Sequence, residues 1–154
     1  MNASQNVVIR EATPSDVPRL VELNHAAYPD LIVDDAVYSP GQIEAHVACF
    51  PQGQLVGEID GKMVGALSTF IPAASIPVLK PHTWLGVTDG GMFRRHDPAG
   101  KTLYLADIYV DPGVQRRGVG QELYSALRGL CRSLDLEHIV AGGRLWATAP
   151  SPSK

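Results

Sequence analysis

The stretch Leu103-Tyr-Leu-Ala-Asp-Ile-Tyr-Val-Asp-Pro-Gly-Val-Gln-Arg-Arg-Gly-Val-Gly120 decides the fold of this chain. Its first eight residues are nearly all apolar, which is typical of a buried, central strand. Asp111-Pro112-Gly113 then ends the strand. From Val119 onward, apolar residues recur at helical spacing. The stretch therefore predicts a central strand that runs through a short basic turn into an amphipathic helix.

The turn between strand and helix carries the groups that bind a phosphate. Gly118 and Gly120 have no Cβ, so a ligand can come close to the backbone. The first amides of the helix have no partner within it, and the helix dipole adds partial positive charge there. Arg116 and Arg117 add full charges. We therefore expect a phosphate or pyrophosphate at this turn, which has neither a Walker motif nor a dinucleotide fingerprint.

The segment Gln115-Arg-Arg-Gly-Val-Gly120 resembles the Q/R-x-x-G-x-G/A motif of the GNAT N-acetyltransferase superfamily. The resemblance implies that the loop holds the pyrophosphate of acetyl-CoA, a co-substrate, and that the preceding strand binds the pantetheine arm. The cofactor-binding residues that it implies are Ile108, Tyr109, Val110, Gln115, Arg116, Arg117, Gly118, Val119 and Gly120. The His and Cys residues show no metal-ligand spacing, so we expect no metal.

Three further segments are similar to a bacterial GNAT subgroup: residues 50–54, residues 96–104 and residues 139–144. Some members of that subgroup are joined to a nitrilase-like carbon–nitrogen hydrolase domain. No pattern for such a domain is present in this chain, so the hydrolase activity is not expected here.

The upstream elements fit the same α/β (α+β) fold, a mixed central sheet flanked by helices. Residues 7–9 predict a first strand, and a helix then runs to Pro29 with either Thr13 or Ser15 as its N-cap. A second helix is expected to begin at Ser39, which starts a Ser-x-x-Gln capping pattern.

The middle and the end of the chain complete this fold. Asp60-Gly61, between β-type runs at 54–59 and 62–71, predicts a hairpin. Residues 72–101 form a long loop. Residues 138–141 predict one more strand, which we expect to lie parallel to the central one because a helix separates the two.

Acetyl transfer to an amine needs a base, because a Lys-like amine with a pKa of about 10.4 is protonated at neutral pH. Asp107 is the candidate, since it is a carboxylate inside an apolar strand, where burial should raise its pKa. A purely structural role for Asp107 is the alternative. Glu58 is a weaker candidate. Trp84, Asp89 and His96 are candidates for the acceptor site or for loop packing.

Two tyrosines could serve either the core or the cofactor. Tyr109 lies on the central strand, and Tyr124 lies near the apolar stripe of the last helix. For Tyr124 we favour packing.

The C-terminal part departs from the family pattern. We expect a GNAT domain over residues 1–145 and a flexible tail over 146–154, without the last helix and strands of the family. The strand at 138–141 would then be an exposed sheet edge, which favours a homodimer. Three interpretations stay open: a truncated chain, a sheet completed by a partner, and a domain that binds without efficient catalysis.

Composition excludes several other classes. The chain has 154 residues, 45% of them hydrophobic, and a net charge of −3, which describes a globular domain without the basic field of a nucleic-acid binder. Residues 1–10 have no apolar core of signal-peptide type, so we expect no leader there, and no run comes near the roughly 18 apolar residues of a membrane span. Two cysteines without ligand spacing fit a cytoplasmic protein.

We therefore expect an acetyl-CoA-dependent N-acetyltransferase, in which the primary amine of a small molecule or protein attacks directly, with neither nucleic acid nor membrane as partner. The alternatives are a catalytically weak module that binds CoA or a partner chain, and an unrelated phosphate-binding domain.

Overall fold

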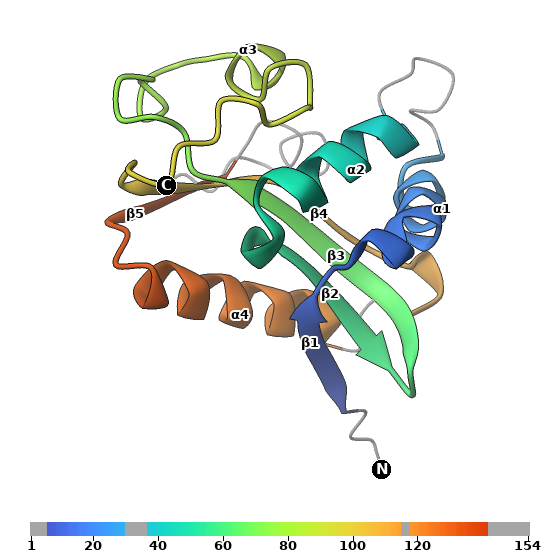
Figure 1. Cartoon of the computed structure of the whole chain (residues 1–154). Coiled ribbons are helices and arrows are strands. Elements are labelled where there is room, and N and C mark those ends of the chain that lie inside the picture. The colour runs from blue at the N-terminus through green and yellow to red at the C-terminus, as the bar shows by residue number, and fades with distance from the viewer. Residues whose placement is uncertain (1–5, 30–36, 115–117, 142–154) are drawn as a thin grey trace.

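The computed structural model describes residues 6–29, 37–114 and 118–141, in which five strands form one sheet in the order β1-β2-β3-β4-β5 (Figure 1). The first four are antiparallel neighbours: β1 (Val7–Glu11), β2 (Gln54–Ile59), β3 (Lys62–Phe70) and β4 (Thr102–Val110). β5 (His138–Ala141) is parallel to β4. The predicted mixed sheet, with a parallel last strand, is confirmed.

Helices cover both faces of the sheet. Figure 1 shows α1 (Val17–Ala27) and α2 (Pro40–Cys49) on one side and α4 (Val119–Ser133) on the other. The short helix α3 (Trp84–Val87) lies within the long loop. The predicted α+β arrangement is therefore present, with α3 as an element that the sequence pattern did not reveal.

The predicted N-cap is wrong for the first helix and correct for the second. Neither Thr13 nor Ser15 caps an α-helix: Thr13 caps a 3-10 turn over Pro14–Asp16, and α1 begins only at Val17. Pro18 then falls in the first turn of α1, where its missing N–H removes no hydrogen bond. α2 begins as predicted, because Ser39 Oγ accepts from the Gln42 N–H at 3.2 Å.

The hairpin turn between β2 and β3 is also as predicted. Both central residues, Asp60 (φ 53°) and Gly61 (φ 79°), have a left-handed backbone. This is the requirement of a type I′ turn, which matches the twist of the two strands.

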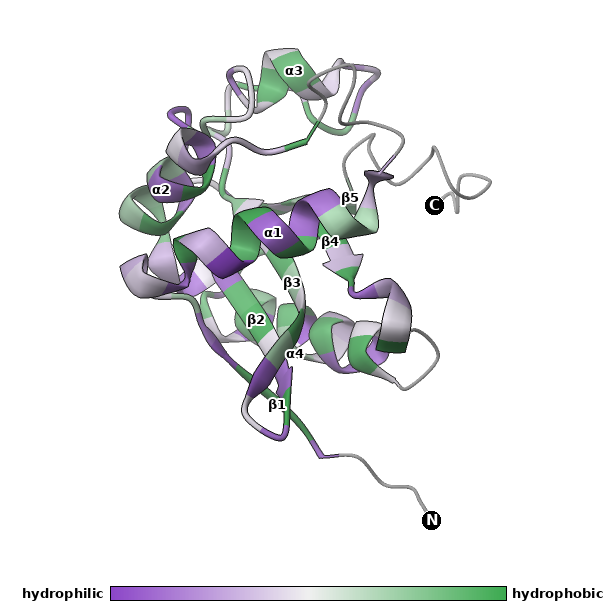
Figure 2. Cartoon of the chain, turned by 90° about the vertical axis from the view of Figure 1, so that its right-hand side faces the viewer, coloured by the Kyte–Doolittle hydropathy of each residue, from purple (hydrophilic) through white to green (hydrophobic). Residues whose placement is uncertain are grey.

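The core has one layer on each side of the sheet. On the α4 side, Leu103 and Leu105 of β4 pack with Leu123 and Leu127 of α4. The opposite layer lies between the sheet and helices α1 and α2, and Figure 2 shows α1 in front of β2 and β3. A third cluster, which includes Phe93, fixes the long loop over one end of β4.

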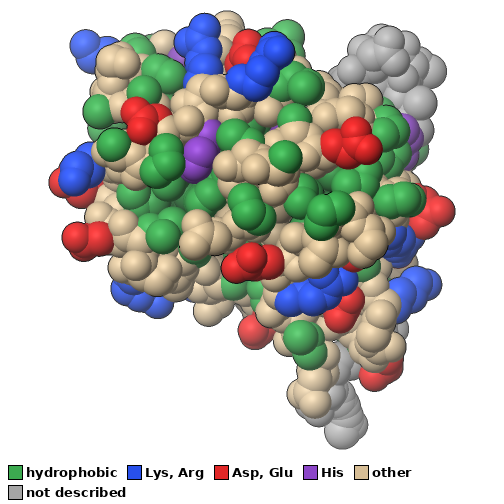
Figure 3. All heavy atoms as spheres, in the orientation of Figure 1, with side chains coloured by type: hydrophobic (Ala, Val, Ile, Leu, Met, Phe, Trp, Pro, Cys, Tyr) green, Lys and Arg blue, Asp and Glu red, His purple; other side chains and the backbone are tan. Residues whose placement is uncertain are grey.

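Charged side chains are interspersed by sign on the face shown in Figure 3, with hydrophobic side chains between them. Near β1, Arg10 bridges Asp16 and Glu58 at 2.8 and 2.9 Å. The Arg10 guanidinium lowers the pKa of Asp16 to about 2. No helix in the described residues is long and apolar enough to cross a membrane.

Candidate active site

A bulge in β4 decides which way Asp107 points. Ser68 of β3 is opposite Asp107, whereas the next residue, Thr69, is opposite Leu105, so Ala106 is an extra residue in β4. A bulge of this kind breaks the alternation of side chains along a strand. Ala106 and Asp107 consequently both face away from α4, and without the bulge Asp107 would point into the apolar layer beneath that helix.

Asp107 is fully buried and is held by side chains of α1 and its C-terminal end. The Tyr28 hydroxyl donates to Asp107 Oδ1 at 2.7 Å. Asn24 Nδ2 donates to Asp107 Oδ2 at 3.5 Å, and Asn24 Oδ1 accepts from the Tyr38 N–H at 2.8 Å. The amide of Asn24 is therefore oriented with its donor toward the carboxylate.

In the second half of β4, one edge has no neighbouring strand among the described residues, and it is called the open edge below. β5 pairs with β4 only from Thr102 to Leu105 in the described residues. The Asp111 N–H donates to Val64 O at 2.8 Å, which makes Gly65 and Val110 a non-hydrogen-bonded pair.

The backbone groups of Tyr109 then face β3, and those of Ile108 and Val110 face the opposite, open edge. Two side chains confirm this direction: the Tyr28 hydroxyl oxygen lies 3.2 Å from Ile108 O, and Trp84 Nε1 donates to Ala106 O at 2.9 Å. Ile108 and Val110 thus lie where the expected contact with pantetheine requires them, and the contact itself stays a prediction. The Tyr109 side chain is buried beneath α1 and α2.

The start of α4 lies just beyond the end of β4. Gly118 is its N-cap with a φ of 85°, which favours glycine, and the first helical bond runs from the Glu122 N–H to Gly118 O. The amides before Glu122 therefore have no partner within the helix. A Cβ on Gly120 would meet no atom of the described residues within 4 Å. This open, donor-rich surface fits a phosphate group.

Close packing holds this helix start against the sheet. Gly57 and Gly65 face each other across β2 and β3. A Cβ on Gly65 would lie 2.6 Å from Val119 Cγ1, and one on Gly57 would lie 3.4 Å from the same atom. Because both are glycines, Val119 can sit directly on the strands.

The other predicted residues are distributed as follows. Gln115, Arg116 and Arg117 lie outside the described residues, as does the tail 146–154. Glu58 is engaged with Arg10. Tyr124 is 38% exposed, so the expectation that it packs in the core is wrong.

Of the three loop candidates, only Trp84 contacts β4 beside Asp107. Asp89 is paired with Arg94 at 2.6 Å. His96 accepts from the Ile71 N–H and stacks on Phe50 at 4.4 Å, and burial lowers its pKa.

Sequence reasoning missed Tyr28 and Asn24 as site residues. Tyr28 lies at the end of the helix that was predicted to run to Pro29, and its contact with Asp107 spans 79 positions in the sequence.

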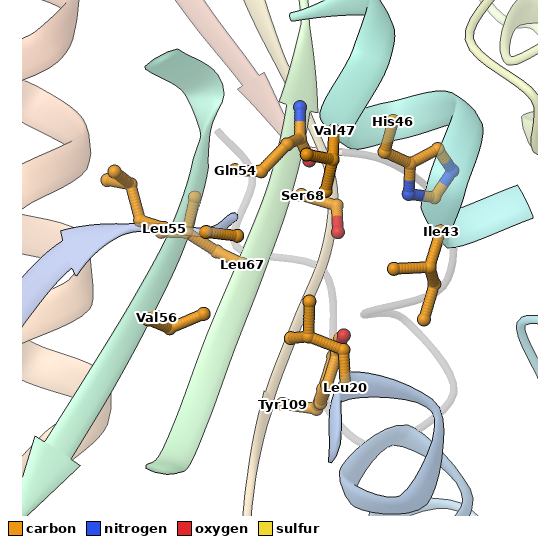
Figure 4. Close-up of a pocket in the computed structure, with 11 residues that line it drawn as sticks. Leu20, Ile43, His46, Val47, Gln54, Leu55, Val56, Leu67, Ser68 and Tyr109 are labelled. Carbon is orange, nitrogen blue, oxygen red and sulfur yellow. The ribbon is translucent and has the colours of Figure 1, made fainter. Parts of the chain in front are cut away.

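A cavity of about 10 Å³ lies between α2 and the sheet (Figure 4). It is lined in part by His46, Gln54 and Ser68, and it is no larger than one water molecule. Burial lowers the pKa of His46 to about 4, so the neutral ring donates from Nε2 to Gly91 O. Two hollows of about 240 and 250 Å³ lie elsewhere on the chain.

The described residues contain no cluster of His, Cys, Asp or Glu that could hold a metal ion. Among the described residues, the site offers one buried carboxylate, the hydroxyl beside it, main-chain donors at a strand edge and a helix start suited to an anion.

A bulged strand with an open edge, followed by a glycine-bearing helix start, fits the GNAT class that the sequence motif indicates. The chain belongs to the GNAT acetyltransferase family, which it matches over residues 17–149. Among curated relatives, it is 32% identical to the uncharacterized N-acetyltransferase YkwB of Bacillus subtilis over 90% of this chain and 61% of that protein.

A second relative supports the predicted subgroup. The chain is 28% identical to the probable hydrolase YhcX of Bacillus subtilis over 92% of this chain and 26% of that protein. The chain thus spans 61% and 26% of the lengths of these two relatives.

Solved structures agree on the fold. The GphF GNAT-like decarboxylase in complex with isobutyryl-CoA has a TM-score of 0.73 and 27% identity, over 87% of this chain and 64% of that one. The putative acetyltransferase yncA of Salmonella typhimurium, with acetyl-CoA, has a TM-score of 0.58 and 23% identity, over 88% and 68%. Structural relatives of this fold therefore bind CoA thioesters.

Proposed function

We propose that this protein is an N-acetyltransferase that moves an acetyl group from acetyl-CoA to a primary amine of a small molecule or protein. The observation that carries the proposal is the arrangement of the second half of β4. A buried carboxylate, Asp107, lies beside the open edge of this strand, and the start of α4 follows a few residues later. Family membership and the CoA thioesters in structural relatives support it.

Acetyl-CoA is a substrate here, and two parts of the chain suit it. The free amides at the start of α4, with Gly118 and Gly120, would bind the pyrophosphate. Gln115, Arg116 and Arg117 would add contacts and charge, as the motif implies. The backbone of Ile108 and Val110 would bind the pantetheine arm along the open edge of β4.

The chemistry then needs an acceptor of the amine proton and a donor to the oxyanion. Asp107 is the proton acceptor in this proposal. The N–H of Ile108 points to the same side as its carbonyl, so it can donate to the thioester oxygen as negative charge develops there. The amine attacks the carbonyl carbon directly, the carbon–sulfur bond breaks, and the thiolate takes up a proton.

Calorimetry with acetyl-CoA tests the binding step. We expect heat of binding with the unchanged protein and loss of binding in Gly120→Glu, because a side chain there occupies the open space beside the helix start. Gly129→Glu is the matched control, since Gly129 lies on the same helix and is equally open. Absence of binding, or equal affinity in all three proteins, would remove the proposal.

Release of free thiol across a panel of amines tests the transfer step. Thiol release that depends on the amine supports acetyl transfer. Acetyl-CoA binding without release for any amine would favour the alternative, a catalytically weak GNAT module that binds CoA or a partner chain.

A second candidate function is decarboxylation of an acyl-CoA that carries a carboxylate next to the thioester. It is favoured by the likeness to the GNAT-like decarboxylase, which reaches 27% identity at a TM-score of 0.73. In that reaction the bond to the carboxylate breaks, carbon dioxide leaves, and the α-carbon takes up a proton. Carbon dioxide release from malonyl-CoA without any amine would establish this function in place of acetyl transfer.

A further inference from the structure

The Asp107 carboxylate cannot contact the acceptor amine directly. Its side chain has 0% exposure, so a substrate nitrogen cannot reach the carboxylate without another group in between. Of its two partners in the described residues given above, the Tyr28 hydroxyl is the nearer, at 2.7 Å from Oδ1, and Asn24 Nδ2 lies 3.5 Å from Oδ2. Tyr28 itself is only half-buried.

The Tyr28 hydroxyl also lies at the open edge of β4. Its oxygen is 3.2 Å from Ile108 O, and that carbonyl points away from β3. The Ile108 N–H, the candidate donor to the thioester oxygen, faces the same edge. One phenol oxygen therefore touches both the buried carboxylate and the strand edge where the reacting carbonyl would lie.

We infer that Tyr28 is a catalytic residue that passes the proton of the acceptor amine to Asp107. This inference rests on the proposed acetyl transfer and deepens it. The alternative is that Tyr28 only ties the end of α1 to β4.

The relay balances its protons. The ammonium form of the acceptor gives one proton to the Tyr28 oxygen, while the Tyr28 proton moves to Asp107 Oδ1. The neutral amine attacks, the carbon–sulfur bond breaks, and the second proton of the attacking nitrogen passes to the departing thiolate. The proton on Asp107 then returns through the half-buried Tyr28 hydroxyl to solvent, which gives amide, free thiol and one proton from ammonium and thioester.

The surroundings hold the pair in place from two sides. The Tyr28 ring makes an edge contact with Tyr109, with centroids 6.4 Å apart. Asn24, fixed by its bond to the Tyr38 N–H, donates to the other carboxylate oxygen. The hydroxyl can therefore be removed as Tyr28→Phe while the ring keeps its packing.

The test compares Tyr28→Phe, Asp107→Asn and the double variant in full-length protein, with Tyr104→Phe as the matched control. Tyr104 lies on β4, the strand that carries Asp107, and its hydroxyl contacts His82 Nε2 at 2.8 Å. We expect kcat to fall about 10²- to 10⁴-fold in Tyr28→Phe, the usual range for loss of general acid–base catalysis, with acetyl-CoA affinity unchanged. Tyr104→Phe should keep the kcat of the unchanged protein.

Two outcomes separate a relay from a tether. Residues that act as one unit are not additive, so the double variant should be no slower than the slower single variant. With an acceptor fluorinated beside its amine, which is largely neutral at the assay pH, the loss in Tyr28→Phe should shrink. A structural tether would not respond to the basicity of the acceptor.

The inference is overturned if Tyr28→Phe retains its kcat, if the two single losses multiply in the double variant, or if the loss is the same for both acceptors. An unchanged protein that binds acetyl-CoA but releases no thiol with any amine would instead overturn the proposed transfer, and the relay with it.

Discussion

The two halves of β4 belong to one strand but serve different purposes. From Thr102 to Leu105 the strand pairs with β5, and Tyr104 and Leu105 pair with β3 as well. Leu103 and Leu105 pack under α4. Beyond the bulge at Ala106, the described structure has no strand beside the second edge, and the buried side chain is a carboxylate. The first half stabilises the fold and the second half offers chemistry, so changes in the two halves should affect different measurements.

The largest effect should come from Asp107→Asn in the second half. The amide is close in shape to the carboxylate but cannot accept a proton, so kcat should fall about 10²- to 10⁴-fold. Steady-state thiol release over a pH series measures this, with thermal unfolding as the check on folding. An unchanged pH–rate profile would remove Asp107 as the base and leave it a structural role.

Leu105→Ala tests the first half. The side chain has 0% exposure and packs under α4, so its truncation should lower the free energy of unfolding by about 2–5 kcal/mol. Denaturant unfolding measures the loss, and kcat per folded molecule should stay close to that of the unchanged protein. Val8→Ala, at a site that is 54% exposed, should change the unfolding free energy by about 0.5 kcal/mol or less.

If Leu105→Ala reduced kcat as strongly as Asp107→Asn while leaving stability intact, the division of β4 into two halves would be wrong.

Gly65→Ala tests how the sheet positions the start of α4. The added Cβ would lie 2.6 Å from Val119 Cγ1, so the helix start must shift, and overpacking of this kind costs about 1–3 kcal/mol. Because the shift also displaces the amides proposed to bind the pyrophosphate, acetyl-CoA affinity should drop about tenfold, which corresponds to about 1.4 kcal/mol. Calorimetry measures it.

The matched control for Gly65→Ala is its combination with Val119→Ala, which removes the clashing methyl group. The double variant should recover most of the affinity. Weak binding that Val119→Ala does not restore would mean that the glycine acts in another way.

Most of the fold could be predicted because its signals are local. Asp60-Gly61 defines the hairpin by backbone preference alone, and Ser39 with Gln42 defines the start of α2. The α4 helix has a clear apolar stripe. Helix α3 was missed because a helix from Trp84 to Val87 is too short to show a period.

The site could be predicted only in part, since its geometry depends on a bulge. In a strand as uniformly apolar as Leu103–Val110, no alternation of residue types reveals where the side chains change face. The sequence therefore indicated Asp107 as unusual but could not say that it faces α1. Tyr28 was beyond reach for the same reason, because its contact forms only once β4 is bulged and α1 is packed on it.

The smallest effect should come from Gly120→Ala, and its two consequences should have opposite signs. The backbone of Gly120 is not left-handed, and a Cβ there would meet no atom of the described residues within 4 Å. Alanine should therefore raise the free energy of unfolding by about 0.4–1 kcal/mol by restricting the unfolded chain. The same methyl group projects into the space proposed for the pyrophosphate, so acetyl-CoA affinity should fall. Gly129→Ala, on the same helix and equally open, should give the stability gain without loss of affinity. Equal affinities in the two variants would show that the open space at Gly120 is ordinary helix surface, and that the second half of β4 leads to some other ligand site.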